Sequence, residues 1–187
     1  MNAVQGLAQA LEKAELIHDR TVIEAAIARM GAQITEALDG ERALFLTVLH
    51  GGLIFAGSLA LSIGSDLQFD YVHATRYRGA TRGAELQWLR RPDAAMRDRS
   101  VILVDDILDE GHTLAALRDA CLAEGARRVL IAVLCEKRHG RCVPGMKADF
   151  VGVQVPDRYV FGYGMDWHEQ GRNLPGIYAL GETRDEG

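Results

Sequence analysis

Short runs of consecutive apolar residues alternate along the chain with longer segments whose apolar positions recur every three or four residues. The apolar runs predict strands buried on both faces of a parallel sheet. They cover residues 43–49, 101–104 and 128–135. The segments with helical spacing predict helices. They cover residues 4–16, 19–38, 53–63 and 114–121. This alternation predicts an α/β fold with a mostly parallel central sheet flanked by helices.

The segment 19–38 has the clearest helical pattern. One apolar stripe runs along it, formed by Ile23, Ile27, Met30, Ile34 and Leu38. Thr21 and Glu24 fit a capping box at its start, and Gly40 fits its end. At 187 residues the chain has the length of one domain. We therefore expect a single domain over residues 1–187, in which residues 1–40 form a helical layer.

Another strand is predicted over residues 67–75, where Leu67, Phe69 and Tyr71 alternate with other side chains. Residues 87–90 predict a strand that returns. The segment between them, residues 76–86, is basic and contains two glycines, and it shows no apolar periodicity. We predict a flexible loop there. Residues 174–178 predict a last strand.

Carboxylates and then a glycine turn follow the apolar run 101–104. Asp105, Asp106 and Asp109 come first, and Gly111 to Thr113 lead into the next predicted helix. Open α/β sheets bind ligands at the carboxyl ends of their strands, and a helix N-terminus binds phosphate. Adjacent carboxylates can also accept hydrogen bonds from a vicinal diol. The stretch therefore fits a ribose 5-phosphate, although a solvated acidic connection would show similar residues.

A similar turn follows the apolar run 43–49, where Leu49-His50-Gly51-Gly52 leads into a predicted helix. Taken alone, a glycine pair between a strand and a helix indicates a tight turn. Here it repeats the pattern of exposed backbone amides at a helix start, which suits a second anion.

Composition narrows the function further. The formal net charge of −5 argues against a nucleic-acid-binding protein. No apolar run has the length of a membrane span, and no secretory signal is evident, so we expect no membrane partner. Three cysteines without CxxC spacing favour a reduced, cytoplasmic setting. Zinc binding by Cys135, His139 and Cys142 is not favoured, because the sequence offers no evident fourth ligand.

The stretch 101–114 resembles the phosphoribosyl-diphosphate loop of the type I phosphoribosyltransferases, which has two acidic residues, two apolar residues, an acidic residue, then a small residue, glycine and threonine. Leu49-His50-Gly51-Gly52 resembles the Leu-Lys-Gly-Gly turn that binds pyrophosphate in the purine enzymes, where the Leu-Lys peptide is cis. The resemblance also implies a lid over residues 76–86. Arg76 and Tyr77 stand where the family has a Ser-Tyr pair, and Tyr77 matches.

The last third of the chain resembles the hypoxanthine-guanine branch of that family. Lys137 matches a lysine that donates to the purine 6-oxygen. Residues 149–166 resemble the segment of the branch in which an aromatic residue stacks on the purine, here Tyr159, and the next residue, Val160, offers backbone groups to the base. Asp166 matches a magnesium ligand and Arg172 an arginine that meets pyrophosphate. The family fold adds a small hood to the sheet.

The resemblance implies a purine salvage reaction in which hypoxanthine or guanine and phosphoribosyl diphosphate give IMP or GMP and pyrophosphate, with Mg²⁺. It implies a homodimer or homotetramer. Asp105 and Asp106 would hold the ribose hydroxyls directly or through the metal, and Asp109 would be the general base for the purine N7 proton. The remaining contacts would be the following: Glu110, Gly111, His112 and Thr113 to the 5-phosphate, and His50, Gly51, Gly52 and Arg172 to pyrophosphate.

Four residues depart from the family pattern, namely His50, Arg76, Glu110 and His112. They bear on catalytic efficiency rather than on the fold, since backbone contacts can survive side-chain changes. Two alternatives stay open from the sequence. One is a non-catalytic nucleotide-sensing regulator of the same fold. The other is a phosphoribosyltransferase for xanthine, adenine or a pyrimidine.

Overall fold

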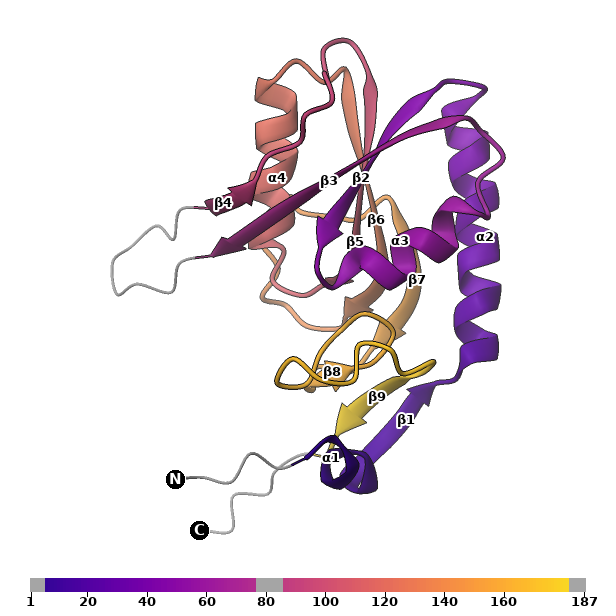
Figure 1. Ribbon diagram of the computed structural model, residues 1–187, viewed down its shortest axis with the longest axis vertical. Coiled ribbons are helices and arrows are strands. Elements are labelled where there is room, and N and C mark those ends of the chain that lie inside the picture. The colour runs from indigo at the N-terminus through magenta and orange to yellow at the C-terminus, as the bar shows by residue number, and fades with distance from the viewer. Residues whose placement is uncertain (1–5, 77–85, 182–187) are drawn as a thin grey trace.

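The computed structural model describes residues 6–76 and 86–181 of the chain (Figure 1). The helices are α1 (Leu7–Lys13), α2 (Arg20–Leu38), α3 (Gly52–Ala60) and α4 (His112–Ala123). The strands are β1 (Ala14–His18), β2 (Ala43–Leu49), β3 (Leu67–Arg76), β4 (Leu86–Arg90), β5 (Ser100–Leu108), β6 (Arg128–Lys137), β7 (Phe150–Val155), β8 (Val160–Phe161) and β9 (Ile177–Leu180).

Six strands form the main sheet, in the order β4-β3-β2-β5-β6-β7. Every neighbouring pair in it is parallel except β3 and β4, which are antiparallel. The central strand β2 pairs with β3 on one side and β5 on the other, so Phe45 lies between Phe69 and Ile102. The predicted α/β fold with a mostly parallel sheet is therefore confirmed.

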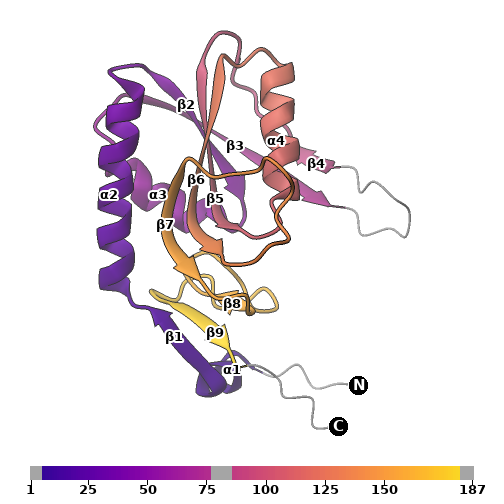
Figure 2. The ribbon, with the colours of Figure 1, turned by 180° about the vertical axis from the view of Figure 1, so that it is seen from behind.

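Helices cover both faces of the main sheet (Figures 1 and 2). On one face α2 and α3 pack against the side chains of Phe45, Ile102 and Val104. On the other face α4 packs through Leu114 and Leu117 against the alternate residues of the same strands. Because both faces of β2 and β5 are covered, their sequences are apolar at consecutive positions instead of alternating.

A second, smaller sheet forms a hood beyond the carboxyl ends of the main strands (Figure 1). Its strand order is β1-β9-β8, and all pairs in it are antiparallel. Behind it lies a small core of Ala10, Phe161 and Trp167, against which α1 packs. The N-terminal strand β1 and the C-terminal strand β9 thus meet in the hood.

The N-terminal segment differs from the prediction in two respects. The helix predicted over residues 4–16 is present as α1, but it ends at Lys13. The wholly helical N-terminal layer is wrong, because residues 14–18 form β1. The pairing of Ala14 with Leu180 decides this, and no local pattern reveals a partner so far along the chain. The predicted capping box is also wrong: Asp19 is the N-cap of α2, and its carboxylate accepts the N–H of Val22 at 2.9 Å.

Several other elements have boundaries that differ from the predicted ones. Strand β5 runs on through Leu108, so it includes the first two carboxylates of the acidic stretch, and β6 runs on to Lys137. Helix α3 begins at Gly52 and ends at Ala60, short of the predicted residue 63. The last strand is Ile177–Leu180 rather than residues 174–178.

The predicted flexible loop falls largely outside the described residues. Arg76 is the last residue of β3 and Leu86 the first residue of β4. Residues 77–85, including Tyr77, are not described, so the lid stays a prediction. Over residues 6–76 and 86–181, no helix has both the length and the apolar character needed to cross a membrane.

Candidate active site

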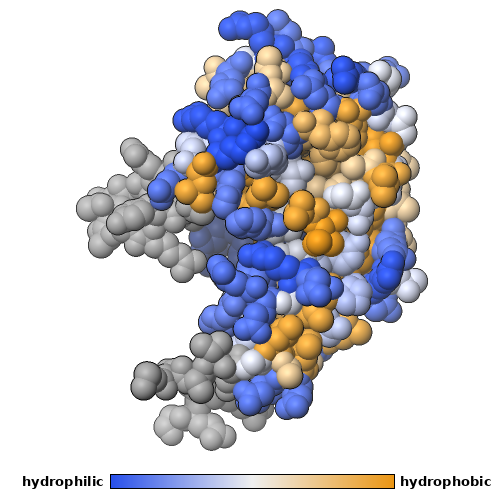
Figure 3. Space-filling model, in the orientation of Figure 1, coloured by the Kyte–Doolittle hydropathy of each residue, from blue (hydrophilic) through white to orange (hydrophobic). Residues whose placement is uncertain are grey.

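A cleft of about 500 Å³ opens at the carboxyl edge of the main sheet. The ends of β2, β3 and β5 and the start of α4 line it, with the residues Val48, Leu49, Gly51, Ala74, Asp105, Asp106, Ile107, Asp109, Glu110, Gly111, His112, Thr113 and Leu114. Figure 3 shows the surface hollowed between the main sheet and the hood, with mostly hydrophilic residues around the hollow. This is the edge at which parallel α/β sheets bind ligands.

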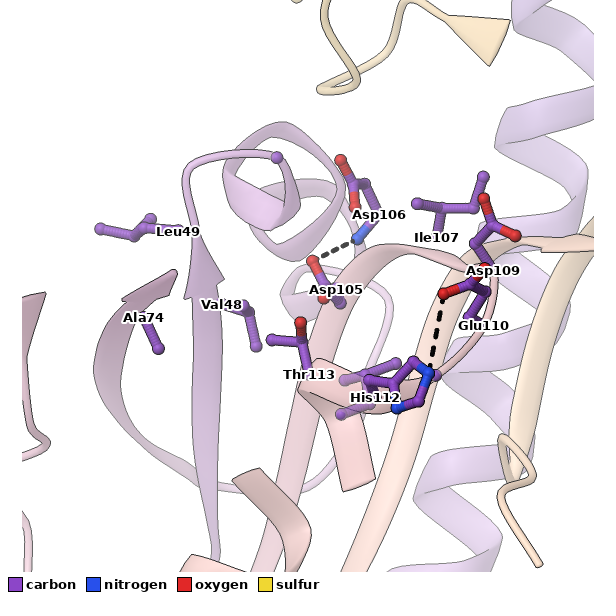
Figure 4. A pocket seen from close by; sticks show the side chains of 13 residues that line it. Val48, Leu49, Ala74, Asp105, Asp106, Ile107, Asp109, Glu110, His112 and Thr113 are labelled. Carbon is purple, nitrogen blue, oxygen red and sulfur yellow. Dashed lines mark hydrogen bonds and ion pairs between the residues drawn. The ribbon is translucent and has the colours of Figure 1, made fainter. Parts of the chain in front are cut away.

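The two adjacent carboxylates lie inside this cleft. The N–H of Asp106 donates to Asp105 Oδ1 at 2.9 Å (Figure 4). Burial raises the pKa of Asp105 well above its ordinary value, and the neighbouring charge of Asp106 raises it further. Burial also raises the pKa of Asp106, although the positive charge of Arg172 opposes this. A ligand that brings hydroxyl donors or a cation would stabilise the ionised form of these two carboxyl groups.

The turn after β5 presents free backbone amides to the cleft. Gly111 caps α4 with φ +79°, a left-handed conformation that glycine adopts without strain. A side chain there would collide with Met146. The N–H groups of the first turn of α4 have no partner within the helix, and they open towards the cleft at Thr113. Glu110 lies beside His112, with Oε2 and Nε2 3.6 Å apart.

The second turn lies across the cleft from the first. The peptide bond between Leu49 and His50 is cis. Gly51 touches Asp106 so closely that a Cβ atom at position 51 would overlap the carboxylate. The His50 ring contacts the ring of His73 at the end of β3, with centroids 4.3 Å apart. The glycine turn after β2 and the acidic pair after β5 are therefore parts of one site.

A loop of the hood reaches the same turn. A Cβ atom on Gly164 would overlap the carbonyl oxygen of Gly51, so the two backbones are in direct contact. Arg172 donates to the carbonyl of Gly164 at 2.7 Å and pairs with Asp166 Oδ1 at 2.7 Å. The predicted residues His50, Gly51, Asp166 and Arg172 are thus brought to one end of the cleft.

Asp109 has a cation on one carboxylate oxygen and an imidazole on the other. Lys137 Nζ donates to Oδ2 at 2.7 Å, and His139 Nε2 lies 2.6 Å from Oδ1. Burial alone would raise the pKa of Asp109, but these hydrogen bonds and charges lower it overall. The carboxylate is therefore held in its ionised form in the free protein, with Lys137 bonded to one of its oxygens.

Tyr159 and Val160 lie in the hood rather than in the lining of the cleft. Tyr159 is half exposed and donates its hydroxyl to the carbonyl of Asp166 at 2.9 Å. Val160 is buried in β8 and pairs with Ala179. A bidentate ion pair from Arg141 to Asp157, at 2.6 and 2.7 Å, joins this part of the hood to the loop after β6.

Two groups of side chains could hold a metal ion, and they differ in whether their ligand atoms already have protein partners. Asp109, His139 and Asp157 have ligand atoms within 4.8 Å of one another. However, Lys137 and His139 already occupy both oxygens of Asp109, and Arg141 occupies those of Asp157. The partly buried pair Asp105 and Asp106 instead offers hard oxygen ligands to which no cationic side chain of residues 6–76 and 86–181 is bonded, which fits Mg²⁺ better.

Sequence reasoning missed three contributors to the site. His139 appeared only as an unfavoured zinc ligand, and its contact with Asp109 depends on the loop after β6 folding back. Arg141 and Asp157 are sixteen positions apart and form an ion pair. Asp157 stands in the segment that resembles the family branch, but nothing in the sequence indicated that Arg141 would be its partner. Only the pairing of β5 with β6, which places Asp109 and Lys137 at one edge, could have pointed to this cluster.

Comparison with known proteins agrees with this fold and geometry. The model of the phosphoribosyl transferase domain family matches residues 13–170. This match places the chain among the phosphoribosyltransferases.

Curated relatives define the branch. The hypoxanthine-guanine phosphoribosyltransferase of Streptococcus mutans is 36% identical over 154 residues, covering 82% of this chain and 85% of that protein. The enzyme of the same name from Lactococcus lactis is 32% identical over 177 residues, covering 94% of each. A crystal structure of a hypoxanthine phosphoribosyltransferase from Staphylococcus aureus superposes with a TM-score of 0.86 at 28% identity, covering 97% of this chain and 96% of the other. The chain belongs to the hypoxanthine-guanine phosphoribosyltransferase family.

Proposed function

We propose that the protein transfers the phosphoribosyl group of 5-phosphoribosyl 1-diphosphate to hypoxanthine or guanine, giving IMP or GMP and pyrophosphate. The observation that carries this proposal is that Asp105, Asp106 and Asp109 line one cleft between two glycine turns, and that Lys137 is bonded to Asp109 at 2.7 Å. A base-recognition pair, a diol-binding pair and two anion sites are what this reaction needs.

The sugar phosphate would lie over the start of α4. The free amides at Gly111, His112 and Thr113 would bind the 5-phosphate, and their partial positive charge favours it. The side chain of Glu110 would turn away from that anion, so that only its backbone takes part. Its carbonyl accepts the N–H of Val143 at 2.8 Å, which holds the turn in place. Asp105 and Asp106 would accept hydrogen bonds from the ribose hydroxyls. The sugar would thereby supply donors to two partly buried carboxylates.

The purine would lie between Asp109 and the hood, with Tyr159 against its face and backbone groups of Val160 at its edge. Lys137 would leave Asp109 and donate to the 6-oxygen, since a lysine can only donate. Asp109 would then accept the N7 proton as the bond from the base nitrogen to C1 of the sugar forms. The low pKa of Asp109 in the free protein would rise once Lys137 moves away.

Mg²⁺ would be held by Asp105 and Asp106, and by Asp166 once Arg172 turns from Asp166 Oδ1 to the pyrophosphate; carboxylate oxygens are the ligand type that Mg²⁺ prefers. When bound, it would neutralise charge on the diphosphate as that group leaves. On the protein side, the amides of His50, Gly51 and Gly52 and the guanidinium of Arg172 would receive the pyrophosphate. Arg172 already lies against Asp166 and Gly164, so it needs no large movement to do so.

Three further expectations belong to this proposal. Residues 76–86 would close over the reactants and exclude water, which would otherwise intercept the cationic sugar carbon. The enzyme would act in the cytoplasm, which is consistent with Cys121, Cys135 and Cys142 all being free thiols. It would assemble as a homodimer or homotetramer.

The direct test is to incubate the purified protein with phosphoribosyl diphosphate, Mg²⁺ and each of hypoxanthine, guanine, xanthine and adenine, and to measure nucleotide and pyrophosphate. We expect IMP and GMP, and loss of product when a chelator removes Mg²⁺. Nucleotide binding without turnover on any base would instead favour a non-catalytic regulator of the same fold. Turnover on xanthine or adenine alone would show that the protein is specific for another base.

A further inference from the structure

The buried imidazole of His139 has no role in the contacts considered so far, although it touches the proposed general base. Its side chain is only 4% exposed. Nε2 lies 2.6 Å from Asp109 Oδ1, on the opposite carboxylate oxygen from Lys137. On the other side of the ring, the N–H of Arg141 donates to Nδ1 at 3.0 Å. Both ring nitrogens therefore have a partner.

These partners determine where the ring proton is. Since the Arg141 N–H is a donor, Nδ1 must be the unprotonated nitrogen, and the ring hydrogen must be on Nε2, from which it donates to Asp109. The bidentate pair of Arg141 with Asp157 holds that peptide in place. The loop thus favours the tautomer whose Nε2–H faces Asp109.

The two donors to Asp109 differ in what happens to them during the reaction. Lys137 is a long side chain that must leave Oδ2 to meet the purine oxygen, whereas His139 is short, buried and held from behind. Resting on the proposed function, we propose that His139 is the positioning residue of the general base: its Nε2–H holds Asp109 Oδ1, so that Oδ2 faces the purine N7 when Lys137 moves to the base.

A pH profile can detect this role, because the loss of a donor raises the pKa of a carboxylate. Four other titratable groups lie around Asp109. Of these, Asp157 also responds to His139, which contributes to lowering its pKa, but its first cause is the hydrogen bond from Arg141. Arg141 and Asp157 form their own ion pair, and Glu110 and Cys142 lie on the flanking turns. The acid limb of kcat/KM reports groups of the free enzyme, so it should move to higher pH when His139 loses its N–H.

The experiment compares His139→Phe, which removes the donor, with His139→Gln, whose amide can donate from a similar position without titrating. For His139→Phe we expect kcat to fall about 10–100-fold, the range for losing a hydrogen bond to a charged group, with an acid limb at higher pH. For His139→Gln we expect kcat and the position of the acid limb to stay near the wild-type values. The control is His18→Phe, which removes another ring contact, from Nε2 to the Gln154 carbonyl at 2.8 Å, and should leave kcat and the limb unchanged.

A second measurement reads the tautomer directly. Nitrogen-15 NMR of histidine-labelled protein should show one ring signal that is lost in His139→Gln, and this ring should carry its hydrogen on Nε2. The proposal is overturned if the enzyme is active and His139→Phe keeps the wild-type kcat and acid limb. It is also overturned if His139→Gln loses as much activity as His139→Phe. A His139 ring that carries its hydrogen on Nδ1 overturns it as well.

If the wild type makes no nucleotide, the proposed function fails. If the wild type makes nucleotide and Asp109→Asn keeps full turnover, the reaction stands, and the general-base assignment and the role of His139 fail.

Discussion

At the scale of single residues, the chemistry depends on how each oxygen of Asp109 is used. In the free protein one oxygen is paired with Lys137 and the other with His139, and together these partners lower the pKa of the carboxyl group. A base with a lowered pKa accepts a proton weakly. Movement of Lys137 to the purine would strengthen the base at the moment when it is needed.

Asp109→Asn tests the general base. We expect kcat to fall roughly 10²–10⁴-fold, because the amide cannot take the N7 proton, while phosphoribosyl diphosphate still binds to Asp105, Asp106 and the α4 turn. Steady-state kinetics and calorimetric binding of the diphosphate measure the two parts separately. Asp105→Asn is the matched comparison, since it should weaken binding as well. Near-normal turnover of Asp109→Asn would remove the assignment.

Gly51→Ala tests the contact between the two halves of the cleft. The added Cβ would overlap the end of the Asp106 side chain, which can swing away, so the fold should survive. Because Asp106 then leaves its place, we expect at least about a tenfold loss in kcat/KM for phosphoribosyl diphosphate. Gly57→Ala on α3 is the control, because nothing lies within 4 Å of its Cβ position. Unchanged kinetics in Gly51→Ala would argue that this turn does not bind pyrophosphate.

At the scale of elements, one buried carboxylate holds the β3–β4 edge together. Asp70 Oδ1 accepts from the N–H of Tyr71 and from Arg90, and Oδ2 accepts from the N–H groups of Asp93 and Ala94 at 2.7 and 2.9 Å. Burial raises the pKa of Asp70, but these backbone donors lower it overall. The strand that leads into the predicted lid is thereby anchored at its other end.

Asp70→Asn should lower the free energy of unfolding at pH 7 by about 2–3 kcal/mol, because an amide presents a donor to groups that all donate. A depressed pKa stabilises the fold above the ordinary carboxyl value, and this stability is lost as the pH falls through the folded-state pKa. The difference between variant and wild type should therefore shrink below about pH 4. Urea unfolding at pH 7 and pH 3 measures it. Asp93→Asn is the control: its side chain is 89% exposed, so the change should stay within about 0.5 kcal/mol. An equal deficit at both pH values would contradict the role of the Asp70 charge.

The sequence predicted most elements of the main sheet because each of them carries its own local pattern. Residues 43–49 and 128–135 are apolar on consecutive positions, and both become buried parallel strands. The strand β1 had no such signal, because it forms by pairing with β9, which lies far along the chain. The extension of β5 over Asp105 and Asp106 was hidden for a related reason: two acidic residues favour a loop locally, and only pairing with β6 keeps them in the strand.

At the scale of the whole molecule, the site combines motifs that are distant in sequence. Parallel strands that end at one edge bring Gly51, Asp106 and Asp109 together, so this part followed from the sequence. The contacts of the hood could not be predicted from the sequence. The approach of Gly164 to Gly51 and the ion pair of Arg141 with Asp157 depend on how the two sheets pack. His139 was missed for the same reason, since the loop after β6 must fold back to reach Asp109.

The central claim concerns which purine base the cleft accepts. This selection depends on Lys137, Asp109 and the hood acting together. A 6-oxo purine offers an acceptor to Lys137, whereas adenine offers an amino group that would leave the charge unpaired. Sites that match a polar group in this way can reject the mismatched analogue by about 10⁴-fold.

The most direct measurement is kcat/KM for hypoxanthine, guanine and adenine with saturating phosphoribosyl diphosphate and Mg²⁺, on the wild type and on Lys137→Ala. The account predicts that the wild type uses both oxo-purines and prefers them to adenine by about 10⁴-fold or more. It also predicts that Lys137→Ala narrows this gap mainly by losing the oxo-purines. Adenine turned over by the wild type as well as hypoxanthine would contradict both the role of Lys137 and the proposed reaction.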